Sequence, residues 1–69
     1  MSIKKKRLEP GAYVQIKDGT HDPMMPENRR DGLVVEISGR RRDRITVLFS
    51  NGAFLTFHKS YVDVLSKIH

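Results

Sequence analysis

The sequence contains no cysteine, and this absence excludes two common ways of stabilising a small domain. Without thiols the chain can form neither a disulfide framework nor a zinc site with thiolate ligands. No apolar run approaches the roughly 20 residues of a membrane-spanning helix, and no apolar segment follows the N-terminal lysines as it would in a secretory signal. We therefore expect a soluble, cytoplasmic protein.

Catalytic and cofactor-binding signatures are also missing from the sequence. There is no glycine-rich phosphate loop, dinucleotide-binding fingerprint, nucleophile elbow or pair of carboxylates at catalytic spacing. His21 beside Asp22 is the only pairing that hints at metal or acid–base chemistry, and the sequence places no third partner near it. We predict a protein that is not an enzyme and that uses no metal or cofactor.

The chain is short and basic. Its 69 residues suffice for one domain with a small core, because a chain of this size buries only about 60% of its unfolded surface. Lysine and arginine number 13 against 8 aspartates and glutamates, which gives a net charge of +5. This balance favours contact with polyanions, among which nucleic acid is the first candidate.

Alternating apolar residues predict an all-β fold. Five segments rich in β-branched and aromatic residues are separated by turn residues, and they are 12–17, 33–37, 45–49, 53–58 and 62–65. In the second segment, Leu33, Val35 and Ile37 fall on one face by the two-residue period. Residues 58–61 suit a single 3₁₀ turn before the last strand.

Asn51-Gly52 is the strongest turn signal in the chain, because both residues tolerate the positive φ that a type I′ hairpin turn requires. The register stays open between a two-residue loop, which places Leu48 beside Leu55, and a four-residue loop, which pairs Phe49 with Phe54. We assign all three phenylalanines to the core. The side chains of this hairpin that we expect to be substantially buried are Phe49, Leu55 and Phe57.

The longest irregular stretch is 18–31, which two prolines and a glycine interrupt. Loops of this length in a compact domain are usually functional or disordered. We expect at least one of Met24 and Met25 to pack onto the core. The domain assignment is a flexible basic arm at 1–9, a folded body at 10–65 and a frayed end at 66–69.

This pattern resembles the KOW and Tudor-type members of the SH3-like small β-barrels over residues 10–65. The resemblance is carried by Pro10-Gly11, Val14, Ile16, Asp18-Gly19, 32–37 and 47–52. It implies a five-stranded barrel with a long first loop and a 3₁₀ turn before the last strand, as in small phage, plasmid or bacterial accessory proteins. It also implies binding through loops at one end of the barrel, to nucleic acid in KOW domains and to proteins in Tudor domains.

Three basic clusters are candidate phosphate contacts, and the densest is the predicted hairpin tip at 38–44. Arginine suits phosphate because its planar guanidinium donates two parallel hydrogen bonds. The interpretation without a binding function is that the tip is a solvated turn whose arginines protect a sheet edge from aggregation. The leading hypothesis is a non-enzymatic nucleic-acid-binding protein with two tyrosines as candidate stacking platforms. Its predicted contact residues are Lys4, Lys5, Lys6, Arg7, Arg29, Arg30, Arg40, Arg41, Arg42, Arg44, Tyr13 and Tyr61.

The alternative hypothesis is a protein-interaction module that uses the 18–31 loop or a sheet edge. The contact residues in this alternative are Pro23, Met24, Met25 and Pro26. The sequence leaves open whether the polymer is RNA or DNA, which protein would be the partner, and whether the chain is a monomer or a weak homodimer.

Overall fold

Five antiparallel strands form one sheet in the order β4-β3-β2-β1-β5 in the computed structural model, which describes residues 8–20, 22–26 and 29–67. The strands are β1 (Ala12–Ile16), β2 (Asp31–Ser38), β3 (Arg44–Phe49), β4 (Phe54–His58) and β5 (Val62–Lys67), and the 3₁₀ helix η1 (Lys59–Tyr61) joins the last two. The all-β fold and the 3₁₀ turn at this place are therefore confirmed.

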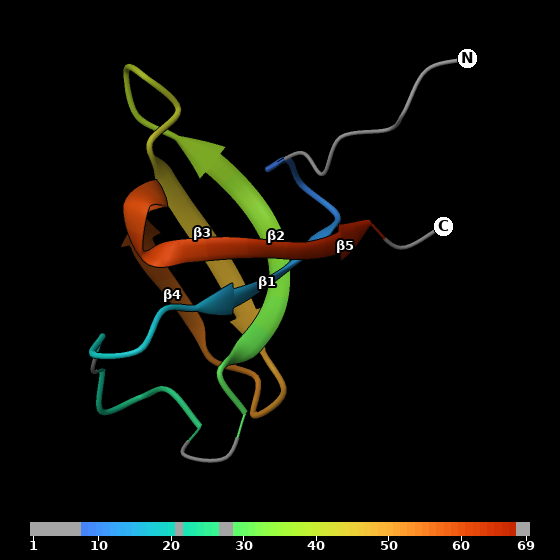
Figure 1. Cartoon of the computed structure of the whole chain (residues 1–69), viewed down its shortest axis with the longest axis vertical. Helices are drawn as coiled ribbons and strands as arrows, with labels where there is room; N and C mark the ends of the chain where they lie inside the picture. The colour runs from blue at the N-terminus through green and yellow to red at the C-terminus, as the bar shows by residue number, and fades with distance from the viewer. Residues whose placement is uncertain (1–7, 21, 27–28, 68–69) are drawn as a thin grey trace.

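The sheet is bent so that its two ends pack against each other. In Figure 1 the long, curved β2 runs from the 18–30 loop at one end of the molecule to the β2–β3 tip at the other, and β1 and β5 lie across β3 and β4. Strands β4 and β5 are the two edges, and within the described part of the chain no pairing joins them. What the structure establishes is one open sheet of five strands.

Inward-facing side chains at two-residue spacing form the core. Strands β1 and β3 supply most of it, with Ala12, Val14, Ile16, Ile45, Val47 and Phe49 each at most 2% exposed. The rings of Phe49 and Phe57 meet edge to face, with centroids 6.2 Å apart, a favourable arrangement for two aromatic rings.

Strand β2 contains a β-bulge, where its register with β3 shifts between Val34 and Glu36. Val35 is the extra residue and is 38% exposed, whereas Val34 is buried and Ile37 packs against the core. The prediction that Leu33, Val35 and Ile37 share one face is therefore wrong, because one inserted residue breaks the two-residue alternation.

The β3–β4 hairpin turns through three residues, 50–52. The amide of Phe49 donates to the carbonyl of Ala53 at 2.9 Å, and the amide of Gly52 donates to the carbonyl of Phe49 at 2.9 Å. Gly52 has a φ of +87°, while Asn51 keeps a negative φ. The turn is thus not the predicted type I′ turn, in which both residues have positive φ, and its one left-handed position falls on the glycine.

This loop sets a register that matches neither of the two pairings that the sequence left open, Leu48 beside Leu55 or Phe49 with Phe54. Leu48 pairs with Phe54 rather than lying beside Leu55. Phe54 consequently lies on the outer face and is 62% exposed, so the assignment of every phenylalanine to the core is wrong for this one. Phe49 and Phe57 are buried as predicted, and Leu55 packs against the core.

The ends of the folded part meet in the sheet, because β1 pairs with β5 from Ile16 opposite Val62 to Ala12 opposite Lys67. Strand β5 therefore continues two residues past the predicted end of the folded body at residue 65. Most of the predicted N-terminal arm lies outside the described residues, but Leu8 already packs against the core.

Candidate functional site

Arg30 holds the loop between β1 and β2 in place. Its guanidinium donates to the carbonyl of Lys17 at 2.7 Å and to that of Thr20 at 3.0 Å, and its Nε lies 3.4 Å from the carbonyl of Ile16. The backbone carbonyl of Arg30 also accepts from the amide of Ile16 at 2.8 Å. Because carbonyl groups of the protein occupy these donors, Arg30 is placed to organise the loop rather than to receive a phosphate.

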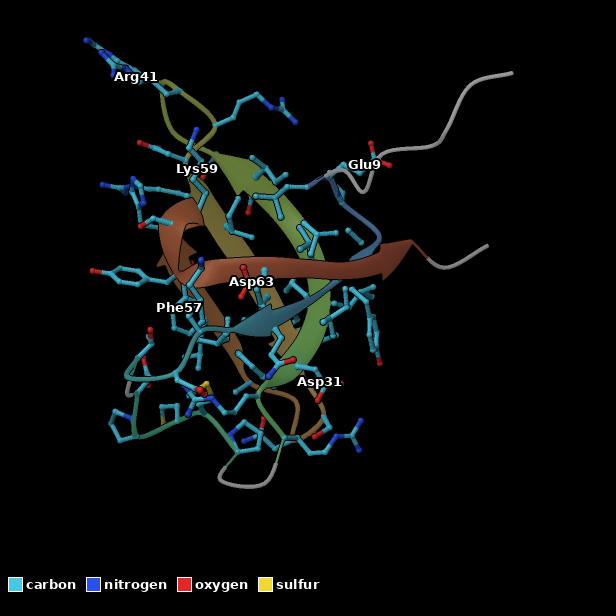
Figure 2. The ribbon with its side chains drawn as sticks, in the orientation of Figure 1. Glu9, Asp31, Arg41, Phe57, Lys59 and Asp63 are labelled. Carbon is cyan, nitrogen blue, oxygen red and sulfur yellow. The ribbon has the colours of Figure 1, made fainter. Side chains whose placement is uncertain are left out.

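The neighbouring Arg29 is also engaged, but on the surface. Its Nε and Nη2 donate to the two carboxylate oxygens of Asp31 at 3.2 and 3.4 Å. This hydrogen bonding raises the pKa of Arg29 and lowers the pKa of Asp31 below its usual value. Asp31 lies at the opposite end of the molecule from Arg41 in Figure 2, so the predicted basic clusters at 29–30 and 40–44 do not form one surface.

The loop between β2 and β3 is a short, defined turn. Ser38 pairs with Arg44 across its base, and the amide of Arg42 donates to the carbonyl of Gly39 at 3.1 Å. Gly39 and Arg42 both have positive φ, +93° and +55°, and for a non-glycine residue this conformation is uncommon. The turn carries its arginines at the far end of the molecule, as the labelled Arg41 in Figure 2 shows.

Within the described residues, the cations at this end have no carboxylate that neutralises them. Among the residues that the structure describes, no carboxylate forms an ion pair with any of them, and all are exposed. Asp43, the acidic residue of the turn, instead lies with Oδ2 3.8 Å from Nε2 of His58. We call this group the basic tip, and its members are Arg40, Arg41, Arg42, Arg44 and Lys59.

Lys59 joins the basic tip because η1 is fastened to the β2–β3 turn. The backbone amide of Lys59 donates to the carbonyl of Asp43 at 2.8 Å. His58 caps η1, since its Nδ1 accepts from the amide of Ser60 at 3.1 Å and lies 2.8 Å from the Ser60 hydroxyl. With Nδ1 as the acceptor, a neutral ring carries its proton on Nε2, toward Asp43. The sequence did not predict that Lys59 belongs with the arginines, although the 3₁₀ turn directly after β4 was a signal for it.

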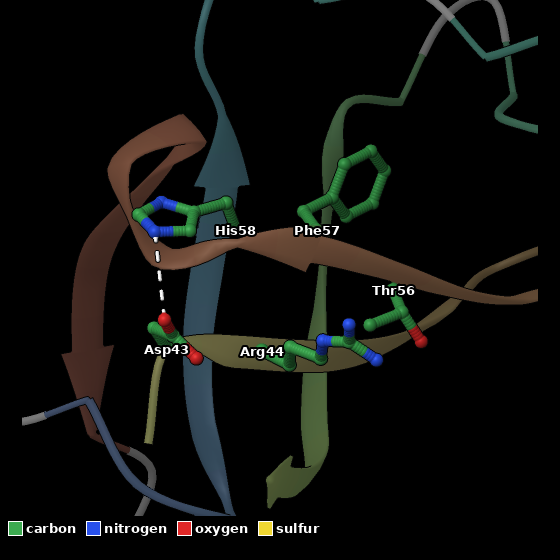
Figure 3. A pocket seen from close by; sticks show the side chains of 5 residues that line it. All are labelled: Asp43, Arg44, Thr56, Phe57 and His58. Atoms are coloured by element: carbon green, nitrogen blue, oxygen red, sulfur yellow. Dashed lines mark ion pairs between the residues drawn. The ribbon is translucent and has the colours of Figure 1, made fainter. Parts of the chain in front are cut away.

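A shallow, open groove of about 460 Å³ lies beside the basic tip. Figure 3 shows its lining, with the side chain of Arg44 extending along β3 toward Thr56 and His58 facing Asp43. The described residues contain no group of three or more histidine, cysteine or acidic side chains that could hold a metal ion. His21, from the pair that hinted at metal chemistry, lies outside those residues.

The two candidate stacking tyrosines lie in different places. Tyr61 in η1 is 50% exposed, and its ring meets His58 edge-on at a centroid distance of 6.4 Å, so it lies near the basic tip. Tyr13 on β1 is half-buried and pairs with Leu33 near the other end of β2. Only Tyr61 of the two is close to the unpaired cations.

The 18–31 loop exposes only part of the surface proposed in the alternative hypothesis. Met25 is 9% exposed and belongs to the core, which confirms that at least one of the two methionines packs there. Met24 is 62% exposed, Pro23 is exposed and Pro26 is half-buried. The side-chain amide of Asn51 donates to the carbonyl of Met24 at 3.1 Å, which ties this loop to the β3–β4 turn.

Lys4, Lys5, Lys6 and Arg7, the first predicted basic cluster, lie outside the described residues. Comparison with protein-family models, with curated proteins and with solved structures finds no match for this chain. In the part of the chain that the structure describes, no helix has the length and hydrophobicity needed to span a membrane.

Proposed function

We propose that the protein is a small, non-enzymatic nucleic-acid-binding module that contacts phosphates through the basic tip. The observation that supports it is the contrast between two sets of cations. Lys17 pairs with Asp63 at 3.3 Å and Arg29 pairs with Asp31 at 3.2 Å, whereas the five cations of the basic tip have no carboxylate partner among the described residues. Unpaired guanidinium groups gathered on a projecting turn suit the bidentate binding of phosphate oxygens.

The fold proposed for this module is an SH3-like barrel. A bent five-stranded antiparallel sheet, a long loop after the first strand and a 3₁₀ helix before the last strand support this assignment. In such an arrangement the loops at one end of the sheet would form the binding surface, and here that end carries the basic tip.

Binding of this kind is dominated by electrostatics, so its dependence on salt is the decisive measurement. Fluorescence anisotropy with labelled single-stranded RNA, single-stranded DNA and duplex DNA gives the affinity at a series of salt concentrations. If all five cations touch phosphate, the slope of log affinity against log salt reaches about −3.5 for single strands and about −4.5 for duplex DNA. A chain that binds none of these polymers near physiological salt would refute the proposal.

A pair of charge-matched variants separates the basic tip from the effect of net charge alone. Arg40→Gln/Arg41→Gln removes two unpaired cations, and Lys17→Gln/Arg29→Gln removes two that already have carboxylate partners. We expect the first variant to reduce the single-strand slope by about 1.4 and to weaken binding roughly 25-fold at about 0.1 M salt. The second should bind almost as tightly as the wild type. Equal losses in the two variants would mean that no particular surface is used.

The second candidate function, a protein-interaction module, is favoured by one observation, the 62% exposure of Met24. If the wild-type chain binds no nucleic acid, the 18–31 loop becomes the surface to test, with Met24→Ala as the probe. Met25 is unsuitable as a probe of binding, because it is part of the core and its truncation would disturb the fold.

A further inference from the structure

The outer face of the sheet carries a row of apolar side chains that the core does not use. Tyr13 opposes Leu33, Leu33 opposes Leu48, and Leu48 opposes Phe54 across four neighbouring strands. Directly opposed residues of antiparallel strands project from the same face. Phe54 stands at the edge of the sheet and is 62% exposed, while the other three are half-buried.

Hydroxyl groups connect this row to the basic tip along the same face. Thr46 opposes Thr56, with their Oγ1 atoms 3.0 Å apart, and the next outward pair is Arg44 opposite His58. Phe54 and His58 are four residues apart on β4, or about 13 Å along the strand. Strands β3 and β4 contain no acidic residue. The outer face of these two strands therefore passes from an aromatic ring through hydroxyls to cations. The exposed Glu36 of β2 opposes Thr46 at the side of this face, and Asp43 lies beside His58 at its far end.

We propose that the outer face of β3 and β4 is the path of a single-stranded nucleic acid, whose phosphates bind at the basic tip and one of whose bases stacks on Phe54. This inference rests on the proposed function and specifies its substrate class. An unpaired base has a free π-face for an exposed ring, whereas the bases of a duplex are stacked on one another. The charge distribution orients the nucleic acid, because its phosphates are attracted to the Arg44 end of this face and its bases suit the apolar row.

An exposed phenylalanine is by itself ordinary on a protein surface. Phe54 differs from such a residue because it is aligned with Leu48, the threonine pair and Arg44 on one face, and because its ring is accessible at the sheet edge. The main alternative use of the same feature is self-association, in which Phe54 would be covered by β4 of a second copy. Self-association predicts a dimer that Phe54→Ala dissociates.

The test uses a single-stranded oligonucleotide of about 10 nucleotides that contains 2-aminopurine, a base whose fluorescence changes when it stacks. We expect Phe54→Ala to weaken single-strand binding roughly 5- to 150-fold, the range for loss of one stacked base. The fluorescence change should disappear, whereas the salt slope and the weaker affinity for duplex DNA should stay the same. Phe54→Tyr should restore both signals, and Phe54→Leu, which keeps an apolar side chain but no ring, should not.

Leu65→Ala is the control, because Leu65 is an exposed apolar residue on β5, the opposite edge of the sheet, and lies outside the apolar row. It should leave the 2-aminopurine signal intact. Salt-dependent binding with unchanged affinity in Phe54→Ala would overturn this inference and leave the proposed function standing, whereas no binding by the wild type would remove both. Equal weakening for single strands and duplex would also overturn it. A dimer in sedimentation that Phe54→Ala dissociates, with oligonucleotide binding unaffected, would assign the row to an interface between copies.

Discussion

Two adjacent arginines in this protein are expected to behave differently when they are replaced. Arg30→Met keeps the aliphatic stem of the side chain and removes its donors, which now bond to the carbonyls of Lys17 and Thr20 at 2.7 and 3.0 Å. The third contact, at 3.4 Å to Ile16, is too long to contribute much. The side chain of Arg30 is partly exposed, so each of the two hydrogen bonds is counted at only about 1 kcal/mol. Their removal should lower the free energy of unfolding by about 2 kcal/mol.

For a domain of this size, 2 kcal/mol corresponds to a fall in Tm of about 8 to 16 °C. Urea unfolding followed by circular dichroism measures the loss directly, and the slope of the transition should not change. Arg29→Met is the natural control, because Arg29 forms an exposed pair with Asp31 and such pairs contribute little. If Arg30→Met were as stable as the wild type but bound nucleic acid more weakly, the guanidinium would be facing a ligand, and the argument for a structural role would fail.

Two further predictions concern the 18–31 loop and the acid side of the stability profile. Met25→Ala should cost about 2 to 3 kcal/mol of stability because Met25 is 9% exposed in the core, whereas Met24→Ala, at 62% exposure, should change the urea midpoint very little. The carboxyl group of Asp31 should titrate by NMR below the usual 3.8, because its hydrogen bond to Arg29 lowers its pKa. A lowered pKa stabilises the fold above the unfolded value, and this contribution is lost as the pH falls through the folded pKa. Arg29→Gln should return the titration toward its ordinary position, and an unchanged midpoint would show that the pair does not form in solution.

The parts of the fold that the sequence predicted are those that depend on local periodicity. Val14 and Ile16 in β1, and Ile45 and Val47 in β3, alternate without interruption, and each is buried. The errors arose where a single extra residue changes the alternation. The bulge at Val35 and the third residue of the β3–β4 loop leave no distinct mark in composition, yet each reverses which side chains face the core.

Some features of the candidate site could likewise be predicted from local sequence, and others could not. The sequence predicted the exposure of the turn arginines, because a turn that begins with a glycine joins two strands there; these arginines are Arg40, Arg41 and Arg42. That Arg30 is engaged could not be predicted, because its partners are backbone carbonyls whose direction depends on how the chain leaves β1. The exposure of Phe54 was hidden by the register, so the sequence assigned to the core the ring that now carries the strongest inference about a bound base.

The pairing of β1 with β5 has a consequence for the order in which the protein is assembled. Strands β2, β3 and β4 are joined by short turns and can pair as soon as they leave the ribosome. Strand β1 lies between β2 and β5, so one of its sides has no partner until residues 62–67 have been synthesised. Because closing such long-range contacts is slow, we expect the meander of β2 to β4 to form first. The nascent chain would then keep its apolar β1 side chains incompletely covered until the last strand arrives.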